Sequence, residues 1–87
     1  MVVKSVHITN ETGLHARPAS MFVQMASKFQ SQITIKHGEN SYNAKSIMAL
    51  LSAGICCGNE VEICAEGNDE EQAASTLVDL IASKFGE

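Results

Sequence analysis

The residues of this chain whose types and spacing could do chemistry together lie in the segment "GLHARPAS" (13–20). His15 directly precedes a stretch with helical spacing, and Pro18 fits the first turn of such a helix, where backbone N–H groups lack helical partners. The free N–H groups of Ala16 and Arg17, together with the helix dipole, therefore form an anion site beside the imidazole. Arg17 adds a planar set of donors that suits phosphate oxygens. An imidazole in this position can act as a nucleophile toward phosphorus.

Other features of the sequence limit this chemistry to carrying a phosphoryl group. Gly13 permits an unusual backbone angle, and we expect it to leave the imidazole uncrowded. No carboxylate cluster with magnesium spacing and no glycine-rich nucleotide loop is present, so we predict a carrier and not an enzyme, with no cofactor. The alternative is that His15 is an ordinary turn residue. His7 and His37 have no comparable neighbours and are predicted to be structural.

The elements that must position His15 follow from the hydrophobic pattern. Alternating apolar residues predict strands over 2–9, 32–36, 41–45 and 60–66, with a hairpin turn at 37–40. Helical spacing predicts helices over 16–30 and 47–52 and a last helix after residue 68. The expected buried stripes are Ala19, Phe22, Val23, Ala26 and Phe29 in the first helix and Ala74, Leu77, Val78, Ile81 and Phe85 in the last. The order β-α-β-β-α-β-α predicts an α+β open-faced sandwich, an antiparallel sheet covered on one side by helices.

Residues at the expected helix ends carry capping signals. Ser46 stands where the N-cap of the short second helix belongs. Asn68 is followed three positions later by Glu71, which resembles a capping pair, and the acidic side chains there suit the positive helix end. Lys84 and Gly86 mark the end of the last helix.

Composition narrows the classes of protein that this chain can be. Its 87 residues predict one domain over 1–87, and a net charge of -4 offers no basic surface to nucleic acid or anionic lipid. The first residues contain no long apolar run, so we expect no export signal, no membrane insertion and a cytoplasmic location. Three cysteines, Cys56, Cys57 and Cys64, lack the CxxC spacing of metal ligands and are expected to be reduced side chains. The same spacing argues against a metal site built from His and Cys side chains.

Two separated motifs, "GLHARPAS" (13–20) and "KSIMALLSAG" (45–54), resemble those of the HPr phosphocarrier family of the bacterial phosphoenolpyruvate-dependent sugar phosphotransferase system. The resemblance implies a four-stranded sheet in the order 1-4-2-3 with three helices on one face. It implies that His15 accepts a phosphoryl group on Nδ1 from phosphorylated Enzyme I and passes it to the IIA domain of a sugar permease. Arg17 would steady the phosphate, and Pro18 would shape the start of the helix.

The resemblance implies a second role for Ser46 beside that of an N-cap. It implies phosphorylation by an ATP-dependent HPr kinase/phosphorylase, followed by binding of a catabolite-control regulator. An alternative function is therefore a regulatory interaction module that acts mainly through phosphorylated Ser46. The presence of His15 argues against the regulatory paralogues that lack this histidine.

A partner-docking surface is the last expectation. Ile47, Met48 and Leu51 crowd a helix of about two turns, which cannot bury every apolar side chain. Methionines adapt to several partners, as a carrier with one donor and many acceptors requires. Ordinary core packing is the alternative for these side chains. The resemblance places Ser20, Met21, Gln24, Ile47 and Met48 around His15, and such a transient carrier is expected to be a monomer.

Overall fold

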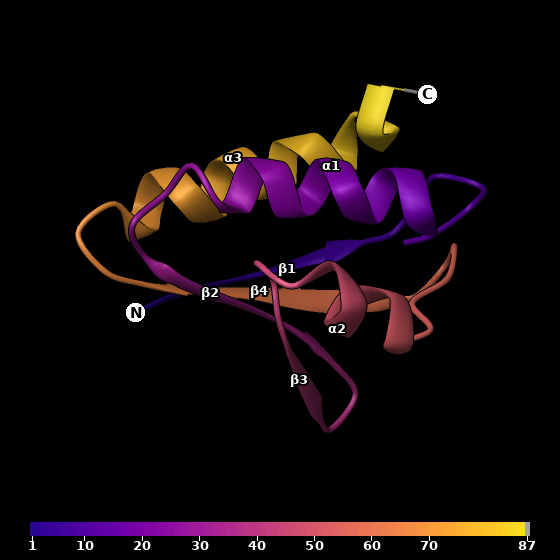
Figure 1. Cartoon of the computed structure of the whole chain (residues 1–87), viewed down its shortest axis with the longest axis horizontal. Helices are drawn as coiled ribbons and strands as arrows, with labels where there is room; N and C mark the ends of the chain where they lie inside the picture. Colours follow the sequence, from indigo (N-terminus) through magenta and orange to yellow (C-terminus); the bar gives the residue numbers. More distant parts are fainter. Residues whose placement is uncertain (87) are drawn as a thin grey trace.

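A computed structural model describes residues 1–86 of the chain. Four strands and three helices follow one another in the order β-α-β-β-α-β-α, and a short 3-10 turn, η1, comes after them (Figure 1). Their bounds are β1 (Val2–His7), α1 (Ala16–Ala26), β2 (Gln32–His37), β3 (Asn40–Asn43), α2 (Ile47–Ser52), β4 (Glu60–Glu66), α3 (Glu70–Ala82) and η1 (Lys84–Gly86). This is the predicted order of elements.

The four strands form one antiparallel sheet in the order β1-β4-β2-β3, which confirms the predicted topology. Ile63 at the centre of β4 pairs with Lys4 of β1 on one side and Ile35 of β2 on the other. In β4 the expected inward side chains, Val61, Ile63 and Ala65, are buried. Because strand residues alternate between the two faces, these three side chains point toward the helices.

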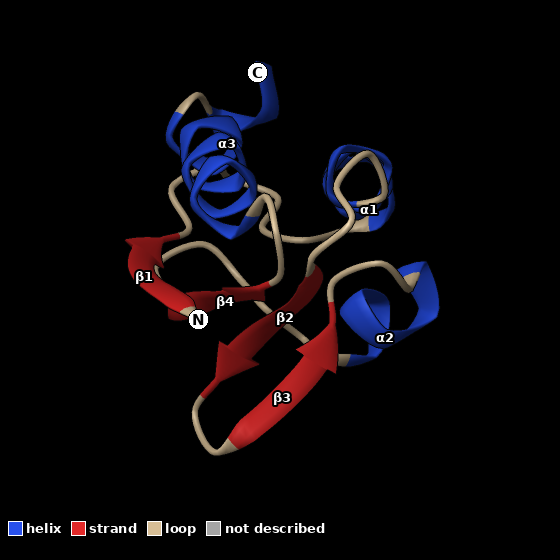
Figure 2. Cartoon of the chain, turned by 90° about the vertical axis from the view of Figure 1, so that its left-hand side faces the viewer, coloured by secondary structure: helices blue, strands red, loops and turns tan. Residues whose placement is uncertain are grey.

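The three helices lie on one side of this sheet (Figure 2). α3 packs on β1 and β4, α2 packs on the end of the sheet beside β3, and α1 lies between them and contacts both. Phe22 of α1, Leu50 of α2 and Leu77 and Ile81 of α3 are fully buried between helices and sheet. The core therefore fixes how α1 and α2 sit relative to each other.

Several element ends differ from the prediction. α1 ends at Ala26 and not at residue 30, because Lys28 and Phe29 donate to carbonyls only three residues back, which closes a turn. Phe29 still packs against the core although it lies beyond the helix. This explains why an apolar residue stands at a position that fits the helical spacing. The first strand ends at His7 because the next residue, Ile8, bonds to the loop before β4 through the Asn59 carbonyl. The third strand spans Asn40–Asn43 and not 41–45.

The predicted capping of the last helix is wrong at both ends. The structure gives Asp69 as the N-cap residue without a side-chain cap, and it is Glu70, not Glu71, that accepts from a loop amide, that of Gly67, at 3.1 Å. At the other end the left-handed residues are Lys84 and Phe85 (φ of 58° and 56°), where we expected glycine. Phe85 holds this conformation while its side chain is buried in the core.

Asp69 instead ties the turn after α1 to the start of α3. Its carboxylate accepts from the backbone N–H of Gln30 at 2.9 Å, from the N–H of Ser31 at 3.0 Å and from the Ser31 hydroxyl. These bonds, the Ser31 hydroxyl first, lower the pKa of Asp69 below its ordinary value of 3.8. Asp69, one of the acidic side chains expected to suit the positive helix end, thus makes a long-range tie.

This tie makes the free energy of unfolding depend on pH. Because the pKa of Asp69 is lower in the folded than in the unfolded chain, its contribution is fully present above the ordinary value of 3.8 and is lost as pH falls through the folded value. Asp69→Asn should lower the melting temperature at neutral pH by several degrees and flatten its decline on acidification. Thermal melts from pH 7 to pH 2 measure both effects. Asp79→Asn, which removes an exposed carboxylate elsewhere on α3, serves as the control. Equal acid slopes in wild type and Asp69→Asn would contradict the prediction.

Candidate phosphoryl-acceptor site

His15 is the N-cap residue of α1. Its backbone is extended (φ -77°, ψ -172°), and its carbonyl accepts the first helical bond, from the N–H of Ala19 at 2.8 Å. Its side chain caps nothing and is exposed. The imidazole is therefore held at the start of the helix by the backbone alone and keeps its ring nitrogens available to a partner.

The first turn of α1 presents donors next to this imidazole. The N–H groups of Ala16 and Arg17 come before that of Ala19, the first helical donor, so they have no acceptor within the helix. The third residue, Pro18, has no N–H and is buried. No acidic residue stands in this turn, so the positive potential of the helix end is not neutralised locally. Arg17 is exposed, and the ion pairs within residues 1–86 involve other side chains. Its guanidinium is therefore available to an anion that binds at the helix end.

The segment before His15 is braced by a second loop. The N–H of Leu14 donates to the carbonyl of Ile55 at 3.0 Å. Gly13 has a φ of 61°, and a Cβ there would stand 2.7 Å from the Ile55 oxygen and 2.8 Å from Cα of Cys56. We expected Gly13 to give the imidazole room. The structure shows a different reason for glycine, the close approach of the loop over residues 55–56.

A buried amide fixes the same segment from the other side. Asn10 is fully buried, and its Nδ2 donates to the Gly13 carbonyl at 2.7 Å and to Thr12 Oγ1 at 3.2 Å. The backbone N–H of Gly13 in turn donates to the Asn10 carbonyl at 3.1 Å. Sequence reasoning missed Asn10, although asparagine shortly before a glycine is a turn signal that could have indicated it.

Comparison with known proteins agrees with this geometry. The family model "PTS HPr component phosphorylation site" matches residues 2–83. The chain belongs to the HPr family. It is 45% identical to the phosphocarrier protein HPr of Treponema pallidum (strain Nichols), over all of this chain and 99% of that protein. It is 46% identical over 81 residues to the HPr-like protein Crh of Halalkalibacterium halodurans, covering 93% of this chain and 96% of that protein.

Solved structures of the HPr family share the fold in detail. HPr-C-His from Thermoanaerobacter tengcongensis superposes with a TM-score of 0.97 at 56% identity, covering all of this chain and 98% of that one. A structure of an HPr dimer from the same organism gives a TM-score of 0.80 at 56% identity, with full coverage of both chains. These likenesses confirm the predicted family and fold, and HPr proteins are phosphocarriers of the phosphotransferase system.

α2 starts at the predicted N-cap, Ser46. The Oγ of Ser46 accepts from the N–H of Ala49 at 3.3 Å, and the Ser46 carbonyl accepts from Leu50 at 3.2 Å. Ser46 is half-buried and leads directly into an apolar surface. This surface consists of Ile47, Met48 and Leu51, whose exposed fractions are 36%, 73% and 42%. We call these three residues the α2 patch.

Removing the Ser46 cap should weaken this HPr chain. We expect Ser46→Ala to lower the free energy of unfolding by about 1 kcal/mol, because the Ala49 N–H loses its acceptor. Ser46→Asp keeps an acceptor and an acidic group at the helix start and should retain most of the stability. Urea unfolding followed by circular dichroism compares the three proteins. A loss for Ser46→Asp as large as that for Ser46→Ala would count against the capping role.

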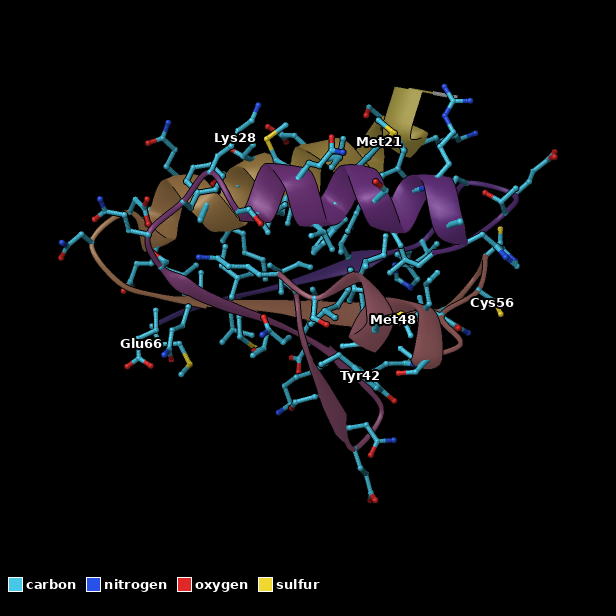
Figure 3. All side chains as sticks on the ribbon, in the orientation of Figure 1. Met21, Lys28, Tyr42, Met48, Cys56 and Glu66 are labelled. Atoms are coloured by element: carbon cyan, nitrogen blue, oxygen red, sulfur yellow. The ribbon has the colours of Figure 1, made fainter. Side chains whose placement is uncertain are left out.

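The remaining residues that we expected to dock partners, Ser20, Met21 and Gln24, lie on α1. Gln24 Nε2 donates to Ser20 Oγ at 3.5 Å, so these two side chains share one face of the helix. Met21 is half-buried against the core, and Figure 3 shows it on the opposite side of the α1 ribbon from Met48. The helices α1 and α2 pack together, but Met21 is not continuous with the α2 patch in this view. That these residues bind partners stays a prediction.

Other features of this HPr-family chain lie away from His15. A cavity of about 380 Å³ opens beside β2 and β3, and it is lined by Gln30, Ser31, Gln32, Ile33, Thr34, Ser41, Tyr42, Asn43 and Lys45. Within residues 1–86 no cluster of three or more His, Cys, Asp or Glu side chains has a geometry suited to a metal ion. In the same part of the chain, no helix has the length and apolar character that crossing a membrane requires.

Proposed function

We propose that this chain accepts a phosphoryl group on His15 from phosphorylated Enzyme I and passes it to IIA domains of sugar permeases. The observation that carries the proposal is the exposed imidazole of His15 at the N-terminus of α1, which makes no capping bond and stands beside the exposed Arg17. Membership of the HPr family supports it, because HPr proteins are phosphocarriers. The chain itself is the carrier of the group and not the enzyme that makes it.

The transfer follows from the geometry of the site. A lone pair on a ring nitrogen of His15, Nδ1 in our proposal, attacks phosphorus, the bond from phosphorus to the donor breaks, and the donor keeps that electron pair. The Ala16 and Arg17 N–H groups and the Arg17 guanidinium then balance part of the phosphoryl charge. The same steps in reverse order release the group when an acceptor nucleophile approaches from solvent. An exposed imidazole suits both directions because donor and acceptor must each reach it.

Ser46 is proposed as a regulatory phosphorylation site in the same carrier. A phosphate on its Oγ would place about two negative charges at the start of α2, where the helix end favours them. The same charge would stand next to the α2 patch and disturb apolar docking there. The kinase would be an ATP-dependent HPr kinase/phosphorylase, and a catabolite-control regulator would bind the product. Similarity to the HPr-like protein Crh supports this second, regulatory function.

One reconstituted reaction tests the proposed carrier function. The chain is incubated with phosphoenolpyruvate and Enzyme I, and an acid-labile, base-stable adduct on His15 is the expected product. Addition of a IIA domain should then move the label to the IIA protein. Failure to form the adduct under conditions in which a known HPr is labelled would overturn the proposal. ATP and the kinase in a parallel reaction should label Ser46 alone.

Oligomeric state and location complete the proposal. We propose a cytoplasmic carrier that docks as a monomer, because its single acceptor histidine must be reached by partners in turn. The dimer structure known for an HPr of Thermoanaerobacter tengcongensis makes this worth measuring. Sedimentation at the concentrations of the transfer assay should give the monomer mass of 9.3 kDa.

A further inference from the structure

We propose that Cys56 and Cys57 form a thiol-modification site for low-molecular-weight disulfides, and that an adduct there slows phosphoryl transfer at His15. The site itself stands on the positions and exposure of the two cysteines. The consequence for transfer rests on the proposed carrier function.

The loop that holds these cysteines lies directly against residues 13–15, which we call the acceptor segment. Ile55 accepts from the N–H of Leu14, the residue before His15, and Cα of Cys56 stands 2.8 Å from the place that a Cβ of Gly13 would occupy. Figure 3 shows the Cys56 side chain at the end of the molecule where α1 begins, pointing outward. A group attached to this loop would therefore project beside the surface that Enzyme I must cover.

The turn also presents its thiols to solvent in a fixed place. Cys56 and Cys57 are both free and exposed. Asn59 Oδ1 accepts from the Cys56 N–H at 2.8 Å, and the Asn59 N–H donates to the Cys56 carbonyl at 3.1 Å, which closes the turn. The Cys56 thiol donates to the Gly54 carbonyl at 3.3 Å. These hydrogen bonds hold the backbone of the loop in place, so an adduct on it would stay close to the acceptor segment.

Cys64 provides an internal comparison. It is half-buried in β4, where it pairs with Val3 and Thr34 on the sheet face opposite the helices. α1 and its N-terminal loop lie on the other side of the sheet (Figure 2). An adduct on Cys64 would therefore leave the surface around His15 free.

The chemistry is thiol–disulfide exchange. The thiolate of Cys56 or Cys57 attacks one sulfur of a symmetrical disulfide, the sulfur–sulfur bond breaks, and the departing thiolate takes up a proton from water. The protein sulfur is oxidised to a mixed disulfide while half of the reagent is reduced to a thiol. Excess thiol reverses the exchange. With oxidised glutathione the adduct adds bulk and negative charge beside a site built to receive an anion, so both partner docking and phosphoryl transfer should slow.

The test uses oxidised glutathione as the probe and three proteins: wild type, the double variant Cys56→Ser/Cys57→Ser and the control Cys64→Ser. Mass spectrometry of the intact chain and of its peptides locates the adduct, and the initial rate of labelling by Enzyme I measures transfer. Wild type and Cys64→Ser should carry the adduct on Cys56 or Cys57 and be labelled several-fold more slowly, with recovery after dithiothreitol. The double variant should keep its full rate.

The outcomes separate this proposal from the carrier function. An adduct confined to Cys64, or none at all, would overturn the modification site. An adduct on Cys56 or Cys57 with an unchanged labelling rate would overturn the control of transfer. If the untreated wild type is never labelled, the carrier function fails, and control of transfer fails with it, but the adduct map still decides whether the two cysteines are a modification site.

Discussion

His15→Ala should abolish phosphoryl transfer from Enzyme I, with no labelled adduct above background. The ring nitrogen is the nucleophile in the proposed reaction, and alanine offers no group that can form the bond to phosphorus. The free N–H groups at the start of α1 would remain, but they only stabilise charge on a group that is bound elsewhere. Labelling with phosphoenolpyruvate and catalytic Enzyme I, followed by intact mass measurement, gives the result directly.

The chain offers two matched controls for this variant. His7 is exposed at the end of β1, with Nε2 3.6 Å from Glu60 Oε2, and His37 is half-buried at the end of β2. Neither stands at a helix N-terminus, so His7→Ala and His37→Ala should be labelled at the wild-type rate. If either variant loses its label while His15→Ala keeps it, the acceptor has been assigned to the wrong residue.

Stability separates loss of chemistry from loss of structure. The His15 side chain makes no capping bond, so truncating it should change the free energy of unfolding by less than about 0.5 kcal/mol. A melt that matches the wild type, combined with absent labelling, would assign the effect to the imidazole. A large fall in melting temperature would contradict the exposed and uncapped position that the structure gives this residue.

Local signals explain why the elements that position His15 could be predicted from the sequence. The strict alternation over 60–66 belongs to a strand with one buried face, and its bounds are correct to the residue. Ser46 was predicted as an N-cap because its hydroxyl acts on an N–H three residues away in the chain. The start of α1 could likewise be predicted from Pro18 and from the helical spacing that follows it. Each of these signals acts within a few residues of the chain, so each can be recognised in the sequence.

The parts that the sequence could not supply are contacts across the fold. Asp69 resembled a local helix signal, but its partners are the amides of Gln30 and Ser31, almost forty positions earlier. Nothing in the pattern distinguishes a carboxylate that caps its own helix from one that ties another turn. The glycine before His15 was interpreted in the same way, by local reasoning, and the structure corrects that interpretation.

Gly13→Ala should therefore damage the fold strongly while leaving every functional side chain in place. The substitution would put a side chain at a φ of 61°, which costs about 1 kcal/mol, and would drive a Cβ to within 3 Å of the backbone at Ile55 and Cys56. Backbone atoms cannot swing aside as a flexible side chain can, so overpacking adds about 1–3 kcal/mol. We expect a total loss of about 2–4 kcal/mol in urea unfolding.

Gly54→Ala isolates the clash from the backbone strain. Gly54 has nearly the same φ, 65°, yet a Cβ there meets nothing within 4 Å. Its substitution should cost only the conformational part, about 1 kcal/mol. The difference between the two variants then measures the close approach of the two loops. Equal losses would show that the loop over residues 55–56 does not brace Gly13.

The same pair of variants tests whether this brace positions the acceptor. In Gly13→Ala the segment must move away from the Ile55 carbonyl, which stretches the 3.0 Å bond from the Leu14 N–H and displaces the start of α1. Labelling of His15 by Enzyme I should slow in Gly13→Ala, measured at a temperature where the variant is fully folded, and stay near the wild-type rate in Gly54→Ala. A folded Gly13→Ala protein labelled at full speed would mean that the contact stabilises the fold without placing the imidazole.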